Sequence, residues 1–308
     1  MLQERQKLLL CLLRTLGGNV AHTDFQKLLF LFTREFEPSP SYDFVPYKFG
    51  GFSFTSYADK RRLTESGLLD EDEDAWRLTA NGERRVRPEH PSAVALHKFR
   101  SKYGTLRGNP LLADVYARYP YYATRSEIVD KVMLDPESRR RIAEAKPQTR
   151  GPGLVTIGYQ GKTLECYLDQ LLCESATVLC DVRRNPLSRK YGFSKGVLSS
   201  TCEKLDIRYE HLPELGIASE ERQSLHGQAD YDALFAEYER NCLPKQNLAL
   251  DKIIGWIRAG KRVALTCFEL EPQQCHRHCV ADALAKRVGK SLVIRHLLMG
   301  APCLANAS

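Results

Sequence analysis

The stretch that decides the fold is GLVTIGYQGKTLECYLDQLLCESATVLCDV, residues 153–182. Apolar runs at 154–158 and 177–182 predict two buried strands, and the spacing of apolar residues over 164–172 predicts an amphipathic helix between them. A strand, a helix and a second strand in this order are typical of a parallel sheet, because parallel strands need a crossover connection. The stretch therefore predicts an α/β fold.

The same alternation continues toward the C-terminus. Further strands are predicted at 207–211, 262–268 and 292–297, and further helices at 197–205, 231–240, 248–258 and 276–287. Together these elements indicate a mostly parallel, Rossmann-like sheet with helices on both faces, in a domain over 151–308. In such sheets ligands bind beyond the carboxyl ends of the strands, so the loops after the strands are the candidate site.

The first 90 residues follow another pattern. Helices are predicted at 6–16, 25–36 and 53–66, followed by strands at 76–79 and 83–86 that flank a tight Asn81–Gly82 turn. This order suggests a smaller α+β domain, and LTESGLLDEDEDAWRLTANGERRV (63–86) resembles the third helix and wing of a winged helix-turn-helix. Winged helices bind DNA or other proteins, and both remain open here. The candidate DNA-binding residues are Lys60, Arg61, Arg62 and Arg77.

Basic charge is concentrated in the middle of the chain. Residues 91–150 carry 12 basic and 6 acidic side chains, which accounts for most of the net charge of +7. This segment is predicted to be a helical connector broken at Pro110 and Pro120, with a solvated linker over 136–152. Its tyrosines and basic residues suit DNA, by stacking and by phosphate neutralisation. The alternatives are that the tyrosines pack internally and that the charge is only solvated.

Composition sets the broad class. The 308 residues suggest two or three domains, and 43% hydrophobic content excludes general disorder. No apolar run approaches the ~18 residues of a membrane span, so we expect no membrane association. The first residues include Glu4 and lack a small-residue cleavage site, which favours a helix over a secretory signal. The ten cysteines are mostly scattered singly, as in a reduced cytoplasmic protein.

Two of the loops after the strands carry residues suited to phosphate or sugar. The glycines of the first loop precede a helix N-terminus, where backbone amides can receive an anion. The second loop begins with an acidic residue and continues with basic and hydroxyl side chains. The substrate-binding candidates in these loops are Gly158, Tyr159, Gly161, Arg183, Asn185, Pro186, Ser188, Arg189 and Phe193.

Three carboxylates at strand ends are catalytic candidates: Glu269, Asp181 and Glu214. Glu269 follows a strongly apolar strand, where desolvation would raise its pKa and suit it to acid–base or nucleophilic work. The alternative is an ordinary solvated glutamate. Asp181 can orient Arg183 toward a phosphate or simply close the loop as a salt bridge.

The loop after the fourth strand adds Cys267, Cys275, His276 and Arg277 as binding candidates. A helix N-terminus favours anions and lowers a thiol pKa, so a phosphate held by His276, Arg277 and backbone amides is the simplest use of this loop. A nucleophilic Cys275 and a zinc site of Cys267, Cys275, His278 and Cys279 are weaker alternatives. We predict neither a metal nor a cofactor.

Four motifs in this half of the chain resemble those of the domain-of-unknown-function family 488. They are TIGYQGKTLE (156–165), DVRRNPLSRKYGFSK (181–195), YEHLPELG (209–216) and CFELEPQQCHRH (267–278). The resemblance covers residues 153–297 and implies the fold rather than a chemistry, because little chemistry is attached to the family name. The first 150 residues lie outside it.

Arginines, a His-Arg helix terminus and strand-end glutamates suit hydrolysis of a nucleoside N-glycosidic bond. Next to a winged helix this combination suggests an enzyme of DNA glycosylase type, a hydrolase acting in repair or defence. Such an enzyme flips its target base out of the stack, and Tyr159, Tyr191 and Phe193 are candidates to receive that base. The alternatives are a DNA-binding regulator that senses a nucleotide, and a protein-interaction module. The oligomeric state is left open.

Overall fold

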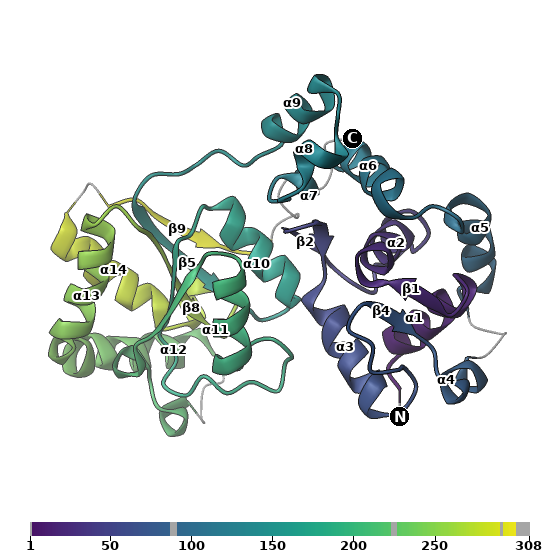
Figure 1. The fold of residues 1–308 in the computed structure, drawn as a ribbon. Coiled ribbons are helices and arrows are strands. Elements are labelled where there is room, and N and C mark those ends of the chain that lie inside the picture. The colour runs from purple at the N-terminus through teal and green to yellow at the C-terminus, as the bar shows by residue number, and fades with distance from the viewer. Residues whose placement is uncertain (1, 87–90, 223–226, 290–291, 300–308) are drawn as a thin grey trace. The chain divides into compact units, whose positions relative to one another are not determined.

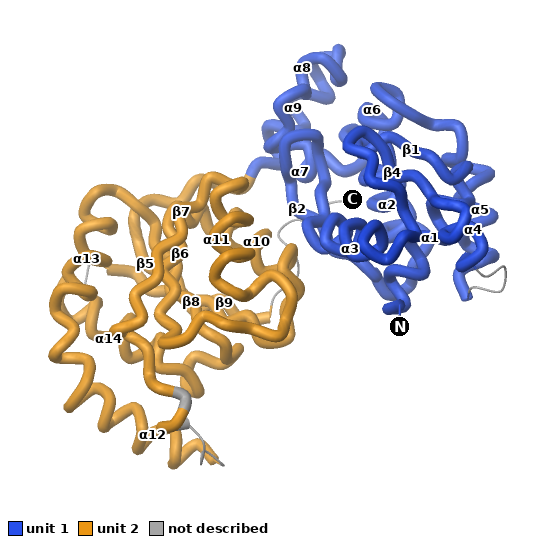
Figure 2. The backbone as a smooth tube through the Cα atoms, turned by 60° about the horizontal axis from the view of Figure 1, so that its bottom comes forward, with its two compact units in different colours: residues 1–146, 304–308 blue, residues 147–303 orange. Residues whose placement is uncertain are grey.

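The structure is a computed structural model that describes residues 2–86, 91–222, 227–289 and 292–299. It divides into two compact units, of which the first ends at residue 146 and the second begins at residue 147 (Figure 2). The segment that we expected to be a connector, up to residue 146, belongs to the first unit. Residues 300–308 of the predicted C-terminal domain lie outside the described residues.

The first unit begins with helices and very short strands (Figure 1). The N-terminus of α3 is fixed by Ser53, whose hydroxyl accepts a hydrogen bond from the Ser56 amide at 3.3 Å. The elements up to the fourth helix are α1 (Glu4–Thr15), β1 (Asn19–Ala21), α2 (His22–Glu35), β2 (Val45–Tyr47), β3 (Gly50–Phe52), α3 (Phe54–Glu65), β4 (Ala75–Arg77) and α4 (Ala80–Arg85). Strands β2 and β3 form an antiparallel hairpin.

The predicted hairpin over 76–79 and 83–86 is wrong. Strand β4 instead pairs antiparallel with β1, and residues 80–85 form helix α4. The cause is Thr79, whose hydroxyl accepts a hydrogen bond from the Gly82 amide at 2.9 Å and so caps a helix where a turn was expected. Beyond β4, an isolated antiparallel bridge joins Leu69 to Leu78.

The remainder of the first unit is helical. Its elements are α5 (Ala93–Tyr103), α6 (Gly108–Arg118), α7 (Pro120–Ala123), α8 (Val129–Val132) and α9 (Pro136–Glu144). The predicted linker over 136–152 is therefore wrong in its first half, where Asp135 caps α9 and accepts a hydrogen bond from Ser138 N at 2.9 Å. Four tyrosines of this segment are buried and cannot stack on bases: Tyr103, Tyr116, Tyr121 and Tyr122.

The second unit is a five-stranded parallel sheet with the strand order β7-β6-β8-β5-β9. Its strands are β5 (Gly153–Gly158), β6 (Val178–Asp181), β7 (Arg208–His211), β8 (Arg262–Cys267) and β9 (Ile294–Leu297). Its helices are α10 (Leu164–Cys173), α11 (Lys195–Lys204), α12 (Gln228–Glu237), α13 (Asn247–Arg258) and α14 (Arg277–Val288). The predicted Rossmann-like α/β architecture is confirmed.

Helices cover both faces of this sheet, with α10 and α11 on one side and α13 and α14 on the other (Figure 1). On the second side, Leu154, Val178 and Leu265 from three strands share one hydrophobic cluster with Ile253 of α13 and Leu284 of α14. Strands buried on both faces hold their ends rigidly. The carboxyl ends of β5, β6 and β8 meet at one edge, and this edge carries the site.

The cysteines differ in one respect from the prediction. Cys173 is disulfide-bonded, whereas we expected the scattered cysteines of this chain to be reduced. Among the described residues, Cys180, Cys202 and Cys279 are free and buried. None of the helices in the described part of the chain has the length and apolar content needed to cross a membrane.

Candidate functional site

A cleft of about 350 Å³ opens at the carboxyl edge of the sheet in the second unit. Loops after β5, β6 and β8 form most of its wall, which combines basic, polar, aromatic and aliphatic side chains. The lining residues are Tyr159, Arg183, Arg184, Asn185, Leu187, Ser188, Arg189, Ile217, Cys267, Phe268 and His276. Residues separated by more than 100 positions in the sequence are thus brought together.

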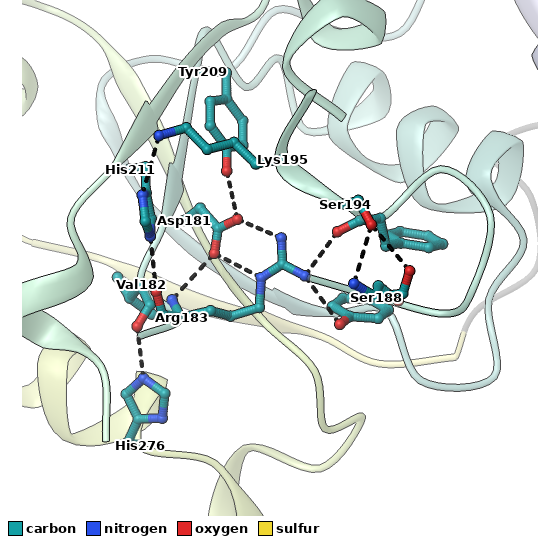
Figure 3. Close-up of polar contacts among 11 residues, drawn as sticks. Asp181, Val182, Arg183, Ser188, Ser194, Lys195, Tyr209, His211 and His276 are labelled. Atoms are coloured by element: carbon teal, nitrogen blue, oxygen red, sulfur yellow. Dashed lines mark hydrogen bonds and ion pairs between the residues drawn. The ribbon is translucent and has the colours of Figure 1, made fainter. Parts of the chain in front are cut away.

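A buried ion pair lies at the end of β6 (Figure 3). The Arg183 guanidinium donates to both carboxylate oxygens of Asp181, from Nε at 2.8 Å and from Nη2 at 2.5 Å. The same carboxylate accepts from the Arg183 amide at 3.1 Å and from the Tyr209 hydroxyl at 2.6 Å. With Asp181 fully buried and its oxygens occupied, its role here is to orient Arg183.

Arg183 in turn positions two aromatic rings. Its Nη1 donates to the Tyr159 hydroxyl at 3.0 Å and to the Phe193 carbonyl at 2.8 Å. Burial disfavours the guanidinium charge, but the bonds to Asp181 outweigh it and raise the pKa of Arg183 above its ordinary value. The rings of Tyr159 and Phe193 stack on each other, with 4.3 Å between their centroids, and both side chains are buried. This burial speaks against the prediction that these two rings receive a base.

The aromatic side chain that is open to the cleft is Phe268. It is 44% exposed, and its ring meets Tyr159 edge to face at 5.3 Å. The sequence prediction missed Phe268, although it stands between two residues that were chosen. The signal available in the sequence was its position at the carboxyl end of the predicted strand 262–268, the end at which ligands bind in parallel sheets.

The loop between β6 and α11 supplies the accessible cations. Arg184 and Arg189 are exposed, and Arg184 makes one long hydrogen bond to the Pro213 carbonyl at 3.4 Å. Ser194 braces this loop, because its hydroxyl donates to the Ser188 carbonyl at 3.0 Å and accepts from the Ser188 amide at 3.1 Å. Pro186 is not among the residues that line the cleft, and its carbonyl accepts a hydrogen bond from the Lys195 amide at the N-terminus of α11, at 3.0 Å.

We had predicted that the glycine loop after β5 offers its amides to an anion, but two of these amides are engaged within the protein. The amides of Tyr159 and Gln160 both donate to the Phe268 carbonyl, at 3.1 and 2.9 Å. Gly158 is required for another reason: a Cβ there would lie 1.7 Å from the Glu269 carbonyl oxygen. Gly161 has a φ of +77°, which favours glycine, and neither glycine lines the cleft.

Glu269 lies at the end of β8 beside the cleft wall. Its side chain is half-buried, and its Oε2 is 3.5 Å from the Sγ of Cys267. The buried Arg277 holds its backbone by donating to the carbonyls of Glu269 and Leu270, the latter at 2.7 Å. Arg277 is thus a positioning residue: its buried guanidinium is engaged by these carbonyls, whereas we had expected it to bind a phosphate.

Cys275 and His276 precede α14 and are both buried. Burial, and the neighbouring Cys267, raise the pKa of the Cys275 thiol well above its ordinary value. The prediction that the helix N-terminus lowers this pKa is therefore wrong, because desolvation outweighs the helix dipole. His276 lines the cleft, and its Nε2 lies 3.0 Å from the carbonyl oxygen of Val182.

The remaining candidates lie elsewhere. Glu214 belongs to the short 3-10 turn Pro213–Leu215 and does not line the cleft. In the first unit, the Lys60 ammonium binds the carbonyls of Asp72 and Ala75 at 2.8 and 3.2 Å, and Arg77 pairs with Asp72 at 2.9 Å. Arg61 and Arg62 are exposed on α3. Sequence reasoning also missed Arg184, Leu187 and Ile217 of the cleft. Arg184 and Leu187 stand within the motif at 181–195 but were not chosen, and Ile217 follows the motif at 209–216.

Fold and cleft together define an α/β protein with a basic, partly aromatic cleft at the carboxyl edge of a parallel sheet. Residues 163–284, which form most of that unit, match the family described as domain of unknown function DUF488. The match confirms the resemblance seen in the sequence for this part of the chain. None of the curated proteins matches the chain.

Proposed function

We propose that the second unit binds a nucleotide of DNA in its cleft and hydrolyses the N-glycosidic bond. The observation that carries the proposal is a cleft lined by exposed arginines and an exposed aromatic ring, with the strand-end carboxylate of Glu269 in contact with its lining residue Cys267. Arg184 and Arg189 suit a phosphate, since a guanidinium binds phosphate oxygens in a bidentate manner. Phe268 suits stacking on an unpaired base.

Glu269 is the proposed catalytic carboxylate. Glycosidic hydrolysis needs a carboxylate that stabilises an oxocarbenium-like centre or activates water. Two contacts hold the Glu269 backbone in place and so support this role. One is the close approach of Gly158, and the other is the hydrogen bond from Arg277 to the Glu269 carbonyl. In this proposal Asp181 acts through Arg183 and does not touch the substrate.

Release of bases from oligonucleotides tests this function. Single-stranded and duplex DNA with varied and damaged bases would be incubated with the full chain, and abasic sites would be counted after alkaline cleavage. We expect Glu269→Gln to lower the rate by about 100-fold or more, the usual contribution of a positioned acid or base. Glu271→Gln, an exposed acid in the same loop, is the matched control and should keep the activity. Unchanged base release by Glu269→Gln would refute the proposal.

We propose a DNA-binding role for the first unit, as a winged-helix variant in which α3 approaches the duplex. The bridge between Leu69 and Leu78 supports this, because it joins the two chain segments on either side of the acidic turn at 70–74, as strands flank a wing. Strand β1 pairs with β4 next to this turn. Arg61 and Arg62 are the exposed cations of α3 that would meet phosphates.

One observation favours a second candidate, a regulator that senses a nucleotide without chemistry. Both carboxylate oxygens of Asp181 accept hydrogen bonds from Arg183 or Tyr209. Asp181 therefore does not serve as a second catalytic carboxylate beside Glu269. A sensor would bind free nucleotide equally well after Glu269→Gln, and the nucleotide would alter DNA affinity with no product formed. Isothermal titration of both proteins with nucleoside monophosphates separates the two functions.

A further inference from the structure

Three side chains with metal-ligating atoms converge at the wall of the cleft. Cys267 ends β8, and Cys275 and His276 precede α14; one ligand atom from each lies within 4.8 Å of the others. The Sγ of Cys267 is 3.9 Å from Nδ1 of His276. Tetrahedral zinc, with bonds of about 2.3 Å to sulfur and 2.0 Å to nitrogen, places its ligand atoms about 3.5–3.8 Å apart. The separation of Cys267 from His276 is thus close to that in a zinc site, and the other two separations lie within 4.8 Å.

The imidazole of His276 is already oriented for a cation. A carbonyl oxygen only accepts hydrogen bonds, so the 3.0 Å contact with Val182 means that Nε2 carries the proton (Figure 3). In the neutral ring the lone pair then lies on Nδ1, the nitrogen that faces Cys267. Histidines that bind metals are typically fixed in this way, by donating their other ring N–H to a carbonyl or carboxylate.

We propose that Cys267, Cys275 and His276 bind one Zn²⁺ ion. Two sulfurs and an imidazole nitrogen are soft and borderline ligands, which select Zn²⁺ over Mg²⁺ or Ca²⁺. All three side chains are buried, and a bound zinc ion deprotonates the thiols that coordinate it. This set differs from the alternative raised by the sequence, because among the described residues His276 converges with Cys267 and Cys275, whereas His278 and Cys279 do not belong to that group.

Two of the three proposed ligands belong to the wall of the cleft, so a bound ion would be reached from the cleft. Cys267 and His276 both line the cleft, and three protein ligands leave one position of a tetrahedral ion for water or substrate. The Oε2 of Glu269 lies 3.5 Å from the Sγ of Cys267, but Glu269 does not belong to the three-residue group. A zinc ion with three protein ligands and one position left for water would lower the pKa of that water.

Metal content of the full chain tests the site directly. The reduced, metal-free protein would be titrated with Zn²⁺ and with Co²⁺, and binding would be followed by elemental analysis and by the thiolate-to-Co²⁺ charge-transfer absorbance. We expect one ion per chain, and an affinity at least 10-fold weaker in Cys275→Ser and in His276→Gln. Cys279→Ser, which changes a buried thiol in the following helix, should bind as the parent does.

The inference is overturned if the folded wild-type chain binds no Zn²⁺, or if Cys279→Ser weakens binding as much as Cys275→Ser does. The wild-type titration decides the matter even where a variant fails to fold, which circular dichroism reveals. Glu269→Gln should still bind the ion. Zinc binding without base release therefore supports the zinc site and refutes the proposed reaction. A failure of the zinc proposal can thus be told apart from a failure of the proposed function.

Discussion

Asp181 and Arg183 form a pair in which both charges are buried and hydrogen-bonded. The carboxylate accepts from the guanidinium, from a backbone amide and from Tyr209, and the guanidinium also holds Tyr159. Removing one partner of such a pair is costly because the other charge then stays buried without compensation. The pair is therefore a structural element of the cleft wall, and its loss should act on stability before it acts on chemistry.

We predict that Asp181→Asn destabilises the second unit by about 3–5 kcal/mol. Urea unfolding of the full chain would be followed by Trp256 fluorescence in a Trp76→Phe background, so that only this unit is reported. The control is Asp251→Asn, which breaks an exposed pair with Arg287 and should cost less than about 1 kcal/mol. Equal losses in the two variants would contradict the structural role of Asp181.

Lys27 is a buried cation in the first unit. Its ammonium donates to the Gly51 carbonyl at 2.8 Å, and burial lowers its pKa to about 7. Between this value and its ordinary pKa, the unfolded chain binds a proton that the folded chain does not. Folding stability should therefore rise with pH from about 7 toward 10, by at most about 1.4 kcal/mol per pH unit from this group.

The Lys27→Met variant tests that prediction. We expect this variant to have a higher free energy of unfolding than the parent. The difference should be largest at or below pH 7 and should become smaller as the pH rises. The measurement is urea unfolding followed by Trp76 fluorescence in a Trp256→Phe background. Lys98→Met, at an exposed position of α5, is the control and should keep the pH profile of the parent. If the difference in free energy of unfolding between variant and parent does not change with pH, Lys27 has the same charge in the folded and unfolded states, and the prediction is wrong.

At the scale of elements, the end of β5 and the loop after β8 depend on each other. A Cβ at position 158 would lie 1.7 Å from the Glu269 carbonyl, and that backbone is held in place by Arg277. We predict that Gly158→Ala destabilises the second unit by about 1–3 kcal/mol and displaces Glu269. Gly255→Ala, in α13 with no atom near the added methyl group, should instead be neutral or stabilising. Unfolding of both variants checks this.

The elements of the second unit could be predicted from the sequence, whereas those of the first unit could only partly be predicted. Strands such as β5 and β8 are buried on both faces, so continuous apolar runs mark them. Strands β1 and β4 have three residues each, too few to show alternation, and their pairing joins positions more than 50 residues apart. The Asn81–Gly82 signal was overridden by the cap from Thr79.

Much of the cleft lining could be predicted because parallel strands end at one edge. The roles of its residues could not, since they depend on distant partners. Arg277 binds carbonyls of the loop after β8, and Arg183 binds Tyr159, where isolated arginines suggested phosphate. A buried guanidinium satisfies its donors with any acceptor that the fold brings near, and the local sequence does not name that acceptor.

At the scale of the whole molecule, the proposed function divides DNA affinity and chemistry between the two units. Of the four candidate DNA-binding residues, Lys60 and Arg77 are engaged within the first unit, and Arg61 and Arg62 are exposed. Each phosphate neutralised on duplex DNA adds about 0.9 to the slope of log affinity against log salt concentration. The number of basic side chains that contact phosphate can thus be obtained from DNA titrations at several salt concentrations.

We predict that Arg61→Ala with Arg62→Ala reduces the salt slope for duplex DNA by about 1.8, because two phosphate contacts are lost. Fluorescence anisotropy with a labelled duplex at several salt concentrations measures it. Arg84→Ala with Arg85→Ala removes the same charge from exposed positions of α4 and should leave the slope nearly unchanged. If both double variants lower the slope equally, the attraction is a property of net charge and α3 is not the contact. If neither does, the first unit does not bind DNA, and a protein partner becomes the better explanation for it.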